Sequence, residues 1–205
     1  MLIITFFSYG EFFAAEKSKK KVKRNPEADK KLLQAVSEGK IEQVEEALSE
    51  GADINVTPTV TFGFLEERGN SPLHIAVEKN DEELLSFLLS CGAKVNIMGK
   101  ECQTPLHLAA EKGHLGCLKL LLEQEGIKID LEGVSCRDVP AIFLAVEEGH
   151  TSCVQALIEK GASLELQSCE DENIVQMAVV YKREEILEQL IAAGANYSLK
   201  DKHSG

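Results

Sequence analysis

The sequence is poor in aromatic residues and contains no tryptophan. Aromatic residues make up 5% of its 205 residues, which is too few to line a typical small-molecule cavity. The hydrophobic fraction of 44% is still large enough to build a long, thin core. We therefore expect neither a cofactor nor a small-molecule substrate.

Short motifs for catalysis and metal binding are also lacking. There is no Cys-x-x-Cys pair of the kind that zinc sites and redox sites use. The phosphate-binding pattern Gly-x-x-x-x-Gly-Lys-Ser/Thr, the His-Glu-x-x-His pattern and the Gly-x-Ser-x-Gly pattern do not occur either. We expect no enzyme activity, no catalytic residue and no metal site within residues 1–205.

Basic residues are outnumbered by acidic ones. The chain has 22 Lys and Arg against 34 Asp and Glu, which gives a formal net charge of −12. Residues 1–27 carry six of the basic residues and three of the acidic ones, so the remainder carries −15. An acidic surface repels phosphate backbones, so the charge argues against a nucleic-acid partner.

The segment of residues 2–24 has several interpretations. Residues 2–15 are mostly apolar but too short to span a bilayer. A signal or export segment is one interpretation, although Glu11 interrupts the apolar stretch and no positive charge precedes it. A membrane-surface anchor supported by the lysines of residues 19–24 is another, and a disordered lead-in or a helix on the first repeat is a third. We expect a cytoplasmic protein, with export as the alternative and no membrane contact outside residues 2–24.

What the sequence does contain is an internal repeat. Residues 104–110 read Thr-Pro-Leu-His-Leu-Ala-Ala, and residues 71–77, which lie 33 positions earlier, read Ser-Pro-Leu-His-Ile-Ala-Val. An alanine marks the same position in five copies, at Ala35, Ala76, Ala109, Ala145 and Ala178, with intervals of 41, 33, 36 and 33 residues. A fixed period in this range indicates one supersecondary unit that stacks on copies of itself.

Each copy has the pattern of two short helices. Ser or Thr followed by Pro is a helix start, because the hydroxyl caps the first turn and the proline ring already has a helical φ. Gly113 permits the left-handed turn that ends the first helix. Leu118, Leu121 and Leu122 then recur at helical spacing in the second helix, which ends before Gly126.

These residues resemble the ankyrin-repeat family. The two Ser/Thr-Pro-Leu-His copies match its signature, and Gly113-His114 and Gly149-His150 match its turn between helices. The resemblance implies an all-α solenoid of helix-turn-helix units with extended β-turn or hairpin fingers. It covers residues 28–205 in five repeats, after an N-terminal segment of residues 1–27. We place the repeats at about 28–60, 69–101, 102–135, 138–170 and 171–205.

Histidine and cysteine fit structural roles better than chemical ones. His74 and His107 share one repeat position, and equivalent positions in a solenoid do not converge on a metal ion. We expect these histidines to bond the backbone of turns and core. Cys117 and Cys153 also share a position, where other copies carry apolar residues, so we expect both to be buried free thiols. Free thiols favour a reducing compartment.

The two outermost repeats differ in their expected surfaces. The first has polar residues at core-facing positions, namely Gln34, Gln43 and Glu46, as a terminal cap requires. The last keeps Met177 and Ile186, which we expect to be more exposed than their counterparts in inner repeats. Residues 201–205 resemble the start of a finger before another repeat, which suggests a longer parent chain.

Two surfaces are candidates for partner binding. The resemblance implies binding on a concave face, where a glutamate recurs at the exposed end of the first helices. The residues expected there are Glu78, Lys79, Glu111, Lys112, Glu147, Glu148 and Tyr181. They are either a solvated acidic face or a row of carboxylates that orients a basic protein partner, with Tyr181 as an aromatic anchor. The other surface is the inserted first finger with Phe62, Phe64 and Leu65, either tucked onto the stack or offered to a partner.

The leading hypothesis for function is a monomeric, non-enzymatic module that binds a protein partner. That is what the resemblance implies, and the family is too widely used to name the partner. One alternative is a regulatory or targeting arm of a longer chain with a further domain. Another is an exported effector, which depends on the apolar N-terminal segment.

Overall fold

The computed structural model describes residues 25–62, 65–129, 139–167 and 172–196, without the side chains of residues 60–67. The chain divides into two compact units, Met1–Lys100 and Glu101–Gly205. The predictions for residues 2–24 and 201–205, and for the finger residue Phe64, lie outside the described residues.

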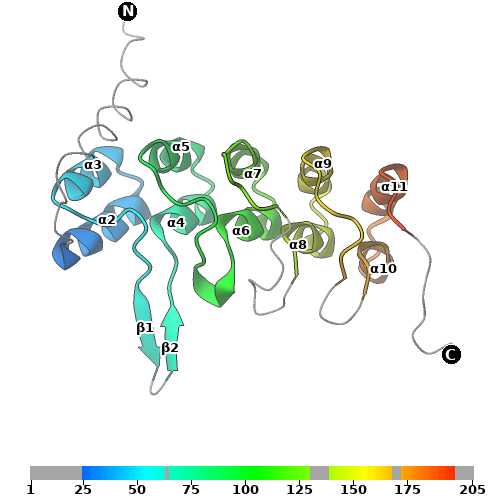
Figure 1. The fold of residues 1–205 in the computed structure, drawn as a ribbon, viewed down its shortest axis with the longest axis horizontal. Helices are drawn as coiled ribbons and strands as arrows, with labels where there is room; N and C mark the ends of the chain where they lie inside the picture. Colours follow the sequence, from blue (N-terminus) through cyan, green and yellow to red (C-terminus); the bar gives the residue numbers. More distant parts are fainter. Residues whose placement is uncertain (1–24, 63–64, 130–138, 168–171, 197–205) are drawn as a thin grey trace, which may run out of the picture. The chain divides into compact units, whose positions relative to one another are not determined.

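The described part of the first unit contains two helix pairs and a hairpin (Figure 1). In chain order the elements are α2 (Pro26–Glu38), α3 (Ile41–Ser49), β1 (Thr59–Phe62), β2 (Leu65–Arg68), α4 (Pro72–Glu78) and α5 (Glu82–Ser90). The first helix of each pair packs against its own partner, and α2 also packs against α4.

The described part of the second unit contains three more helix pairs. Its α-helices are α6 (Pro105–Lys112), α7 (Leu115–Leu122), α8 (Ala141–Glu148), α9 (Thr151–Glu159), α10 (Ile174–Val180) and α11 (Glu184–Ala192). A short 3₁₀ turn, η1 (Lys100–Cys102), precedes them. The first helices α6, α8 and α10 pack on one another in order, and so do the second helices α7, α9 and α11. Stacked helix pairs of this kind confirm the predicted architecture.

The helix starts follow the chemistry expected from the sequence. The hydroxyl oxygens of Ser71 and Thr104 accept bonds from the backbone N–H groups of the histidines three residues later, and a proline opens each helix. The last repeat lacks Ser/Thr-Pro and uses a different cap. There the side chain of Asn173 accepts from the backbone of Gln176 at 2.9 Å, and the Gln176 side chain accepts from the backbone of Asn173 at 2.8 Å.

The predicted core positions are buried. The alanines that mark the repeat, Ala76, Ala109, Ala145 and Ala178, are at most 1% exposed. Cys117 and Cys153 are buried free thiols, as predicted. Burial raises the pKa of the Cys153 thiol, because the uncharged form needs less solvation. Small side chains here let neighbouring helices approach closely.

The inserted first finger forms the hairpin of β1 and β2. The strands are antiparallel, with Thr59 opposite Arg68 and Phe62 opposite Leu65. Backbone bonds continue to the base of the hairpin, where the Gly69 N–H donates to the Pro58 carbonyl at 2.6 Å. The side chains of Phe62 and Leu65 lie outside the described part, so whether the finger is tucked or offered to a partner stays a prediction.

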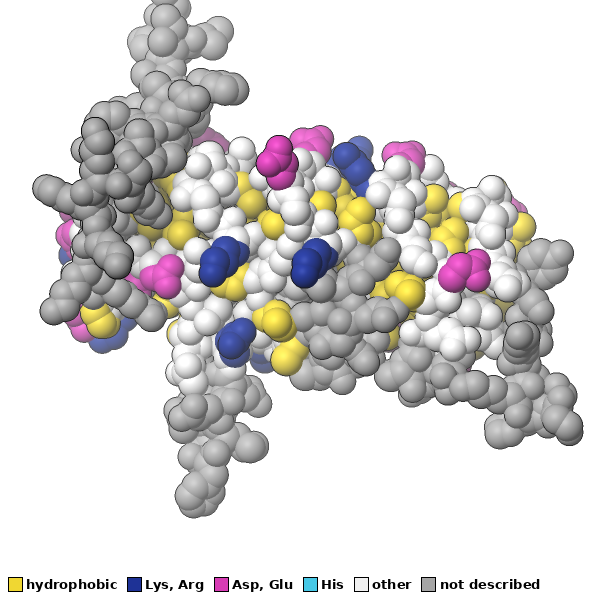
Figure 2. All heavy atoms as spheres, viewed as in Figure 1, with side chains coloured by type: hydrophobic (Ala, Val, Ile, Leu, Met, Phe, Trp, Pro, Cys, Tyr) yellow, Lys and Arg dark blue, Asp and Glu magenta, His cyan; other side chains and the backbone are white. Residues whose placement is uncertain are grey.

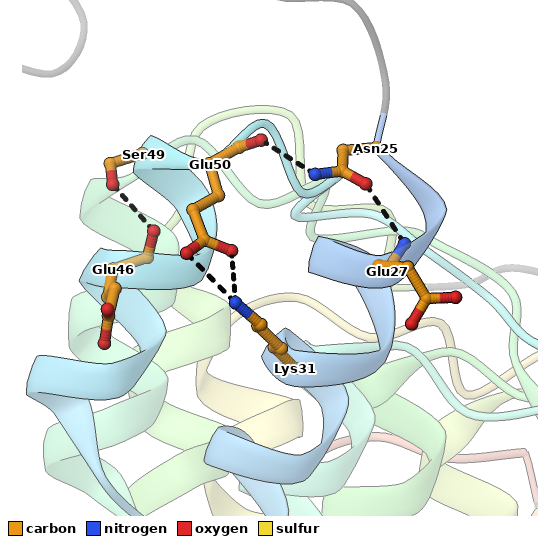
Figure 3. Close-up of polar contacts among 6 residues, drawn as sticks. All are labelled: Asn25, Glu27, Lys31, Glu46, Ser49 and Glu50. Carbon is orange, nitrogen blue, oxygen red and sulfur yellow. Dashed lines mark hydrogen bonds and ion pairs between the residues drawn. The ribbon is translucent and has the colours of Figure 1, made fainter.

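The first repeat has the polar outer surface expected of a cap. Gln34, Gln43 and Glu46 are exposed. Figure 3 shows Lys31 of α2 reaching across to Glu50, whose two carboxylate oxygens lie 3.0 and 2.8 Å from Nζ. The hydrogen bond to this carboxylate, followed by its charge, raises the pKa of Lys31.

The expectation for the last repeat was wrong in its choice of residues. Met177 is 6% exposed and Ile186 is 1% exposed, so both are buried, as are their counterparts Leu144 and Cys153 in the preceding repeat. Both lie on helices that pack against α8 and α9, which accounts for their burial. The large apolar residues of this repeat that are exposed are instead Val179, Val180, Tyr181 and Ile191, at 58%, 60%, 39% and 49%.

Candidate functional site

The predicted binding residues lie at the C-terminal ends of the first helices. We call these positions the rim: in the second unit they are Glu111 and Lys112 at the end of α6, Glu147 and Glu148 at the end of α8, and Val180 and Tyr181 at the end of α10. A glutamate is unfavourable here, because the carbonyl end of a helix carries partial negative charge. Such a misplaced charge typically costs about 0.3–1 kcal/mol. Helix stability therefore does not explain why glutamates recur at the rim.

Side chains of the next helix pair form hydrogen bonds to the rim backbone, and we call each of these contacts a tie. In the second unit, Nε2 of His150 lies 2.9 Å from the Glu111 carbonyl oxygen. One pair later Arg183 occupies the same repeat position, and its Nε and one terminal nitrogen donate to the Glu147 carbonyl at 3.2 and 2.6 Å. Each tie satisfies a carbonyl that the end of a helix leaves without an intrahelical partner.

Glycine makes room for these ties. Gly113 has φ +69, and a Cβ added to it would lie 2.5 Å from Nδ1 of the His150 ring. Gly149 has φ +83, and its added Cβ would lie 2.7 Å from the Arg183 guanidinium carbon. The glycines therefore serve two needs at once, a left-handed turn and space for the neighbouring side chain.

The rim carboxylates are held in place by other side chains. Glu111 accepts from Gln103 Nε2 at 2.7 Å and from Lys112 Nζ at 3.1 Å. Glu147 accepts from the Tyr181 hydroxyl at 3.0 Å. The two glutamates are thus partly buried and ordered, whereas Glu148 is exposed. Tyr181 keeps 39% of its surface exposed, so one side chain both orients a carboxylate and presents an aromatic ring.

The first unit has its own rim, at the ends of α2 and α4. Glu78 and Lys79 are exposed. Glu38 accepts from Lys40 at 2.6 Å and from Gln34 at 2.9 Å. These bonds, that of Lys40 first, lower the pKa of Glu38. The Glu38 carboxylate is therefore engaged by side chains of its own unit, whereas Glu78 is exposed.

Acidic side chains do not merge into one patch on the visible face. Over each unit, Figure 2 shows them as separate spots, with lysine and apolar side chains between them. A partner on this face therefore meets mixed chemistry, in which carboxylates alternate with apolar and basic groups.

His74 and His107 are buried, and the ring of each lies against the hydroxyl that caps its own helix. A bond to backbone was predicted for both, and the His74 ring accepts one from the Ser71 N–H. Nδ1 of His74 lies 2.8 Å from the Ser71 hydroxyl, and Nδ1 of His107 lies 2.7 Å from the Thr104 hydroxyl. Among the described residues, no group of three or more His, Cys, Asp or Glu side chains is arranged to hold a metal ion. Over the same residues, no helix combines the length and the apolar character that a membrane span requires.

Sequence reasoning missed two groups that build the rim. Gln103 lies before the cap of α6. Arg183 occupies the position in the last repeat that the turn histidine occupies in the fourth repeat. The alignment of Arg183 with His150 was available from the repeat period, but its contact with the carbonyl of the preceding pair depends on how the helices pack. That contact becomes visible only in the three-dimensional structure.

Comparison with known proteins identifies the architecture. A family model described as Ankyrin repeats (3 copies) matches residues 32–133 and 132–201. The chain belongs to the ankyrin-repeat family. This confirms the resemblance seen in its Ser/Thr-Pro-Leu-His copies. Ankyrin repeats are generally protein–protein interaction modules and are typically non-enzymatic, which favours a protein partner here.

Similar ankyrin-repeat regions occur in proteins of very different kinds. Human Transient receptor potential cation channel subfamily A member 1 is 37% identical over 115 residues, which are 56% of this chain and 10% of that protein. The Drosophila melanogaster protein of the same name is 35% identical over 78 residues, or 38% of this chain and 6% of that protein. Target of rapamycin complex 2 subunit AVO2 of Saccharomyces cerevisiae is 36% identical over 64 residues, or 31% and 15%. This ankyrin-repeat chain therefore matches only a small part of each relative.

Proposed function

We propose that this chain is a non-enzymatic binding module that holds a basic segment of a partner protein along the rim of its second unit. Glu111, Glu147 and Tyr181 are the residues that carry the interaction. The single observation behind the proposal is that carboxylates recur at helix ends where they oppose the helix dipole and are nevertheless ordered by dedicated contacts.

Ordering of the rim favours binding. A flexible glutamate loses side-chain entropy when it pairs with a partner lysine or arginine, by about 0.5–1.5 kcal/mol per side chain. Gln103 and the Tyr181 hydroxyl already fix one carboxylate each. A carboxylate that is already held in place loses less side-chain entropy when a lysine or arginine of a partner pairs with it.

The described cysteines do not favour a catalytic role. Cys153 is buried and its raised pKa disfavours the thiolate, which is the reactive form. Cys102 is exposed, but an exposed thiol is not by itself a catalytic arrangement. A binding role therefore rests on the rim and requires no chemistry from these thiols.

A charge-matched pair of variants tests the proposal. The rim variant is Glu111→Gln, Glu147→Gln and Glu148→Gln. The control carries the same three-charge change on exposed residues at or after the ends of the second helices of the same unit, Glu123→Gln, Glu125→Gln and Glu159→Gln. Proteins captured from cells by wild type, rim variant and control are compared by quantitative mass spectrometry. A partner lost by the rim variant and kept by the control supports the proposal.

The captured partner is then titrated against each variant over a salt series. Rim charges mainly accelerate association, and exposed charges are screened beyond about 10 Å at 0.1 M salt. We expect the wild-type association rate to fall with salt and the rim variant to show a weaker dependence. The variant Phe62→Ala with Phe64→Ala tests the inserted finger as a rival surface. If it alone weakens binding, and does so at all salt concentrations, the rim proposal is wrong.

A further inference from the structure

The last helix pair exposes an apolar face. In the preceding pair of the same unit, the equivalent face is covered. Val146 of α8 and Val154 of α9 are fully buried, and helices α10 and α11 pack against α8 and α9. At the equivalent positions of the last pair, Val179 is 58% exposed and Leu187 is half-buried. Together with Ile191 these two residues form what we call the end face.

Carboxylates border the end face. Glu184 and Glu188 are exposed on α11, and they lie three residues before Leu187 and Ile191 respectively. Residues three and four apart are neighbours on a helix surface, so these four side chains share one side of α11. The second unit as a whole carries 18 acidic and 9 basic residues, a formal charge of −9. The end face is thus an apolar strip in an acidic setting.

A further repeat that docks with the same tie does not fit this face. Both earlier first helices of the unit end in a glycine, Gly113 or Gly149, that leaves room for the tying His150 or Arg183. The last pair has Lys182 at that position, also in the left-handed region with φ 55. Asn80 in the first unit also has a Cβ at this position, so Lys182 argues only against a tie of the His150 or Arg183 kind.

A second copy of this chain is also a poor occupant. Two end faces placed against each other would bring Glu184 and Glu188 of each copy toward like charges. Docking the first helix pair of another copy would bury Gln43 and Glu46 against apolar side chains. An unpaired buried carboxylate is strongly unfavourable. Both arrangements conflict with the charges and polar groups that are exposed at these surfaces.

We propose that the end face binds an amphipathic helix of a partner protein that carries apolar side chains flanked by lysine or arginine. A helix is the shape that covers the equivalent face one pair earlier, where α10 and α11 lie against α8 and α9. Apolar side chains match Val179, Leu187 and Ile191, and basic ones match Glu184 and Glu188. This surface is distinct from the rim and goes beyond the function proposed for it.

The test uses the full chain and two fluorescein-labelled synthetic helices. One has leucines at positions i, i+3, i+4 and i+7 with flanking lysines, and the other has glutamates in place of the lysines. Binding is followed by fluorescence anisotropy. The end-face variant is Val179→Ser with Ile191→Ser. Its control is Met98→Ser, which removes another exposed apolar side chain, in the first unit. Circular dichroism melts confirm that both variants are folded.

We expect the lysine helix to bind saturably and the glutamate helix not to bind. The end-face variant should weaken binding about tenfold or more, the scale of losing a buried apolar anchor, while Met98→Ser leaves it unchanged. Glu184→Gln with Glu188→Gln should weaken binding a few-fold at low salt, relative to Glu123→Gln with Glu125→Gln.

Other outcomes overturn the proposal. The proposal is wrong if the lysine helix shows no saturable binding, or if the Val179→Ser and Ile191→Ser variant binds it as tightly as wild type does. It is also wrong if the glutamate helix binds with the same affinity as the lysine helix. A loss of binding in the Glu111, Glu147 and Glu148 variant alone would assign the helix to the rim instead. Sedimentation that shows a dimer, lost on Val179→Ser and Ile191→Ser, would assign the face to a second copy.

Discussion

The first and the last helix pair use the same repeat pattern but present opposite chemistry at their free sides. In the first pair, the exposed Gln34, Gln43 and Glu46 face solvent, and the ion pair of Lys31 with Glu50 joins its two helices. In the last pair, Val179 and Ile191 are exposed and apolar. The difference teaches that the first pair carries polar side chains where a terminal cap has them, whereas the last pair keeps apolar side chains exposed.

The largest expected effect concerns a position that both pairs share. Ile186→Ala removes a buried side chain from the last pair and should lower the free energy of unfolding by about 2–4 kcal/mol. Gln43→Ala, at the equivalent exposed position of the first pair, should change it by about 0.5 kcal/mol or less. Urea unfolding followed by circular dichroism measures both. Similar small losses would mean that the last pair is loosely packed and that the comparison fails.

The next largest effect on stability is expected at the valine that follows the repeat-marking alanine in both pairs. Val36 is fully buried and Val179 is exposed. Threonine has nearly the same shape as valine but adds a hydroxyl, which costs about 1–3 kcal/mol when buried without a partner. Val36→Thr should therefore destabilise the protein by that amount, and Val179→Thr should be close to neutral. A destabilising Val179→Thr would show that something already covers the end face.

A smaller difference is expected between the glycine that ends the first helix of the first pair and Gly149, which ends α8 and contacts Arg183 of the last pair. Gly39→Ala in the first pair meets only Asp81 Oδ2 at 3.5 Å, so it suffers left-handed strain of about 1 kcal/mol. Gly149→Ala suffers the same strain and also displaces Arg183, so it should be destabilised by about a further 1 kcal/mol. Combining Gly149→Ala with Arg183→Ala tests the coupling. If the two effects simply add, the tie contributes nothing at this position.

The repeat pattern predicted most of the fold because it depends on local chemistry. Ser71, Thr104 and their prolines specify helix starts through bonds only three residues long. The period then placed Ala109 and Cys117 in the core without any knowledge of packing. Asn173 was not predicted as a cap, although Asn with Gln three residues later is a readable capping box.

The candidate site was predicted less well because it depends on contacts between helix pairs. The sequence placed Glu111, Glu147 and Tyr181 at helix ends, but it did not predict the bonds from Gln103 to Glu111 and from Tyr181 to Glu147. The exposed side of the last pair was assigned to Met177 instead of Val179, since the periods of two adjacent helices do not say which side faces the next pair. Such contacts depend on crossing angles that the repeat period does not specify.

The smallest expected effect concerns the exposed ion pair on the first pair. Lys31→Met removes its bond to Glu50. The folded pKa of Lys31 is raised, so its contribution to stability is fully present below the unfolded pKa of about 10.4 and is lost as the pH rises through the folded pKa. The stability difference between wild type and Lys31→Met should therefore be constant near neutral pH and shrink above about pH 10.5. Lys119→Met, an equal change of charge on exposed α7, controls for net charge. Urea unfolding across this pH range measures the difference. A difference that stays constant up to the most alkaline pH at which the protein folds would mean that the charge of Lys31 does not account for its contribution to stability.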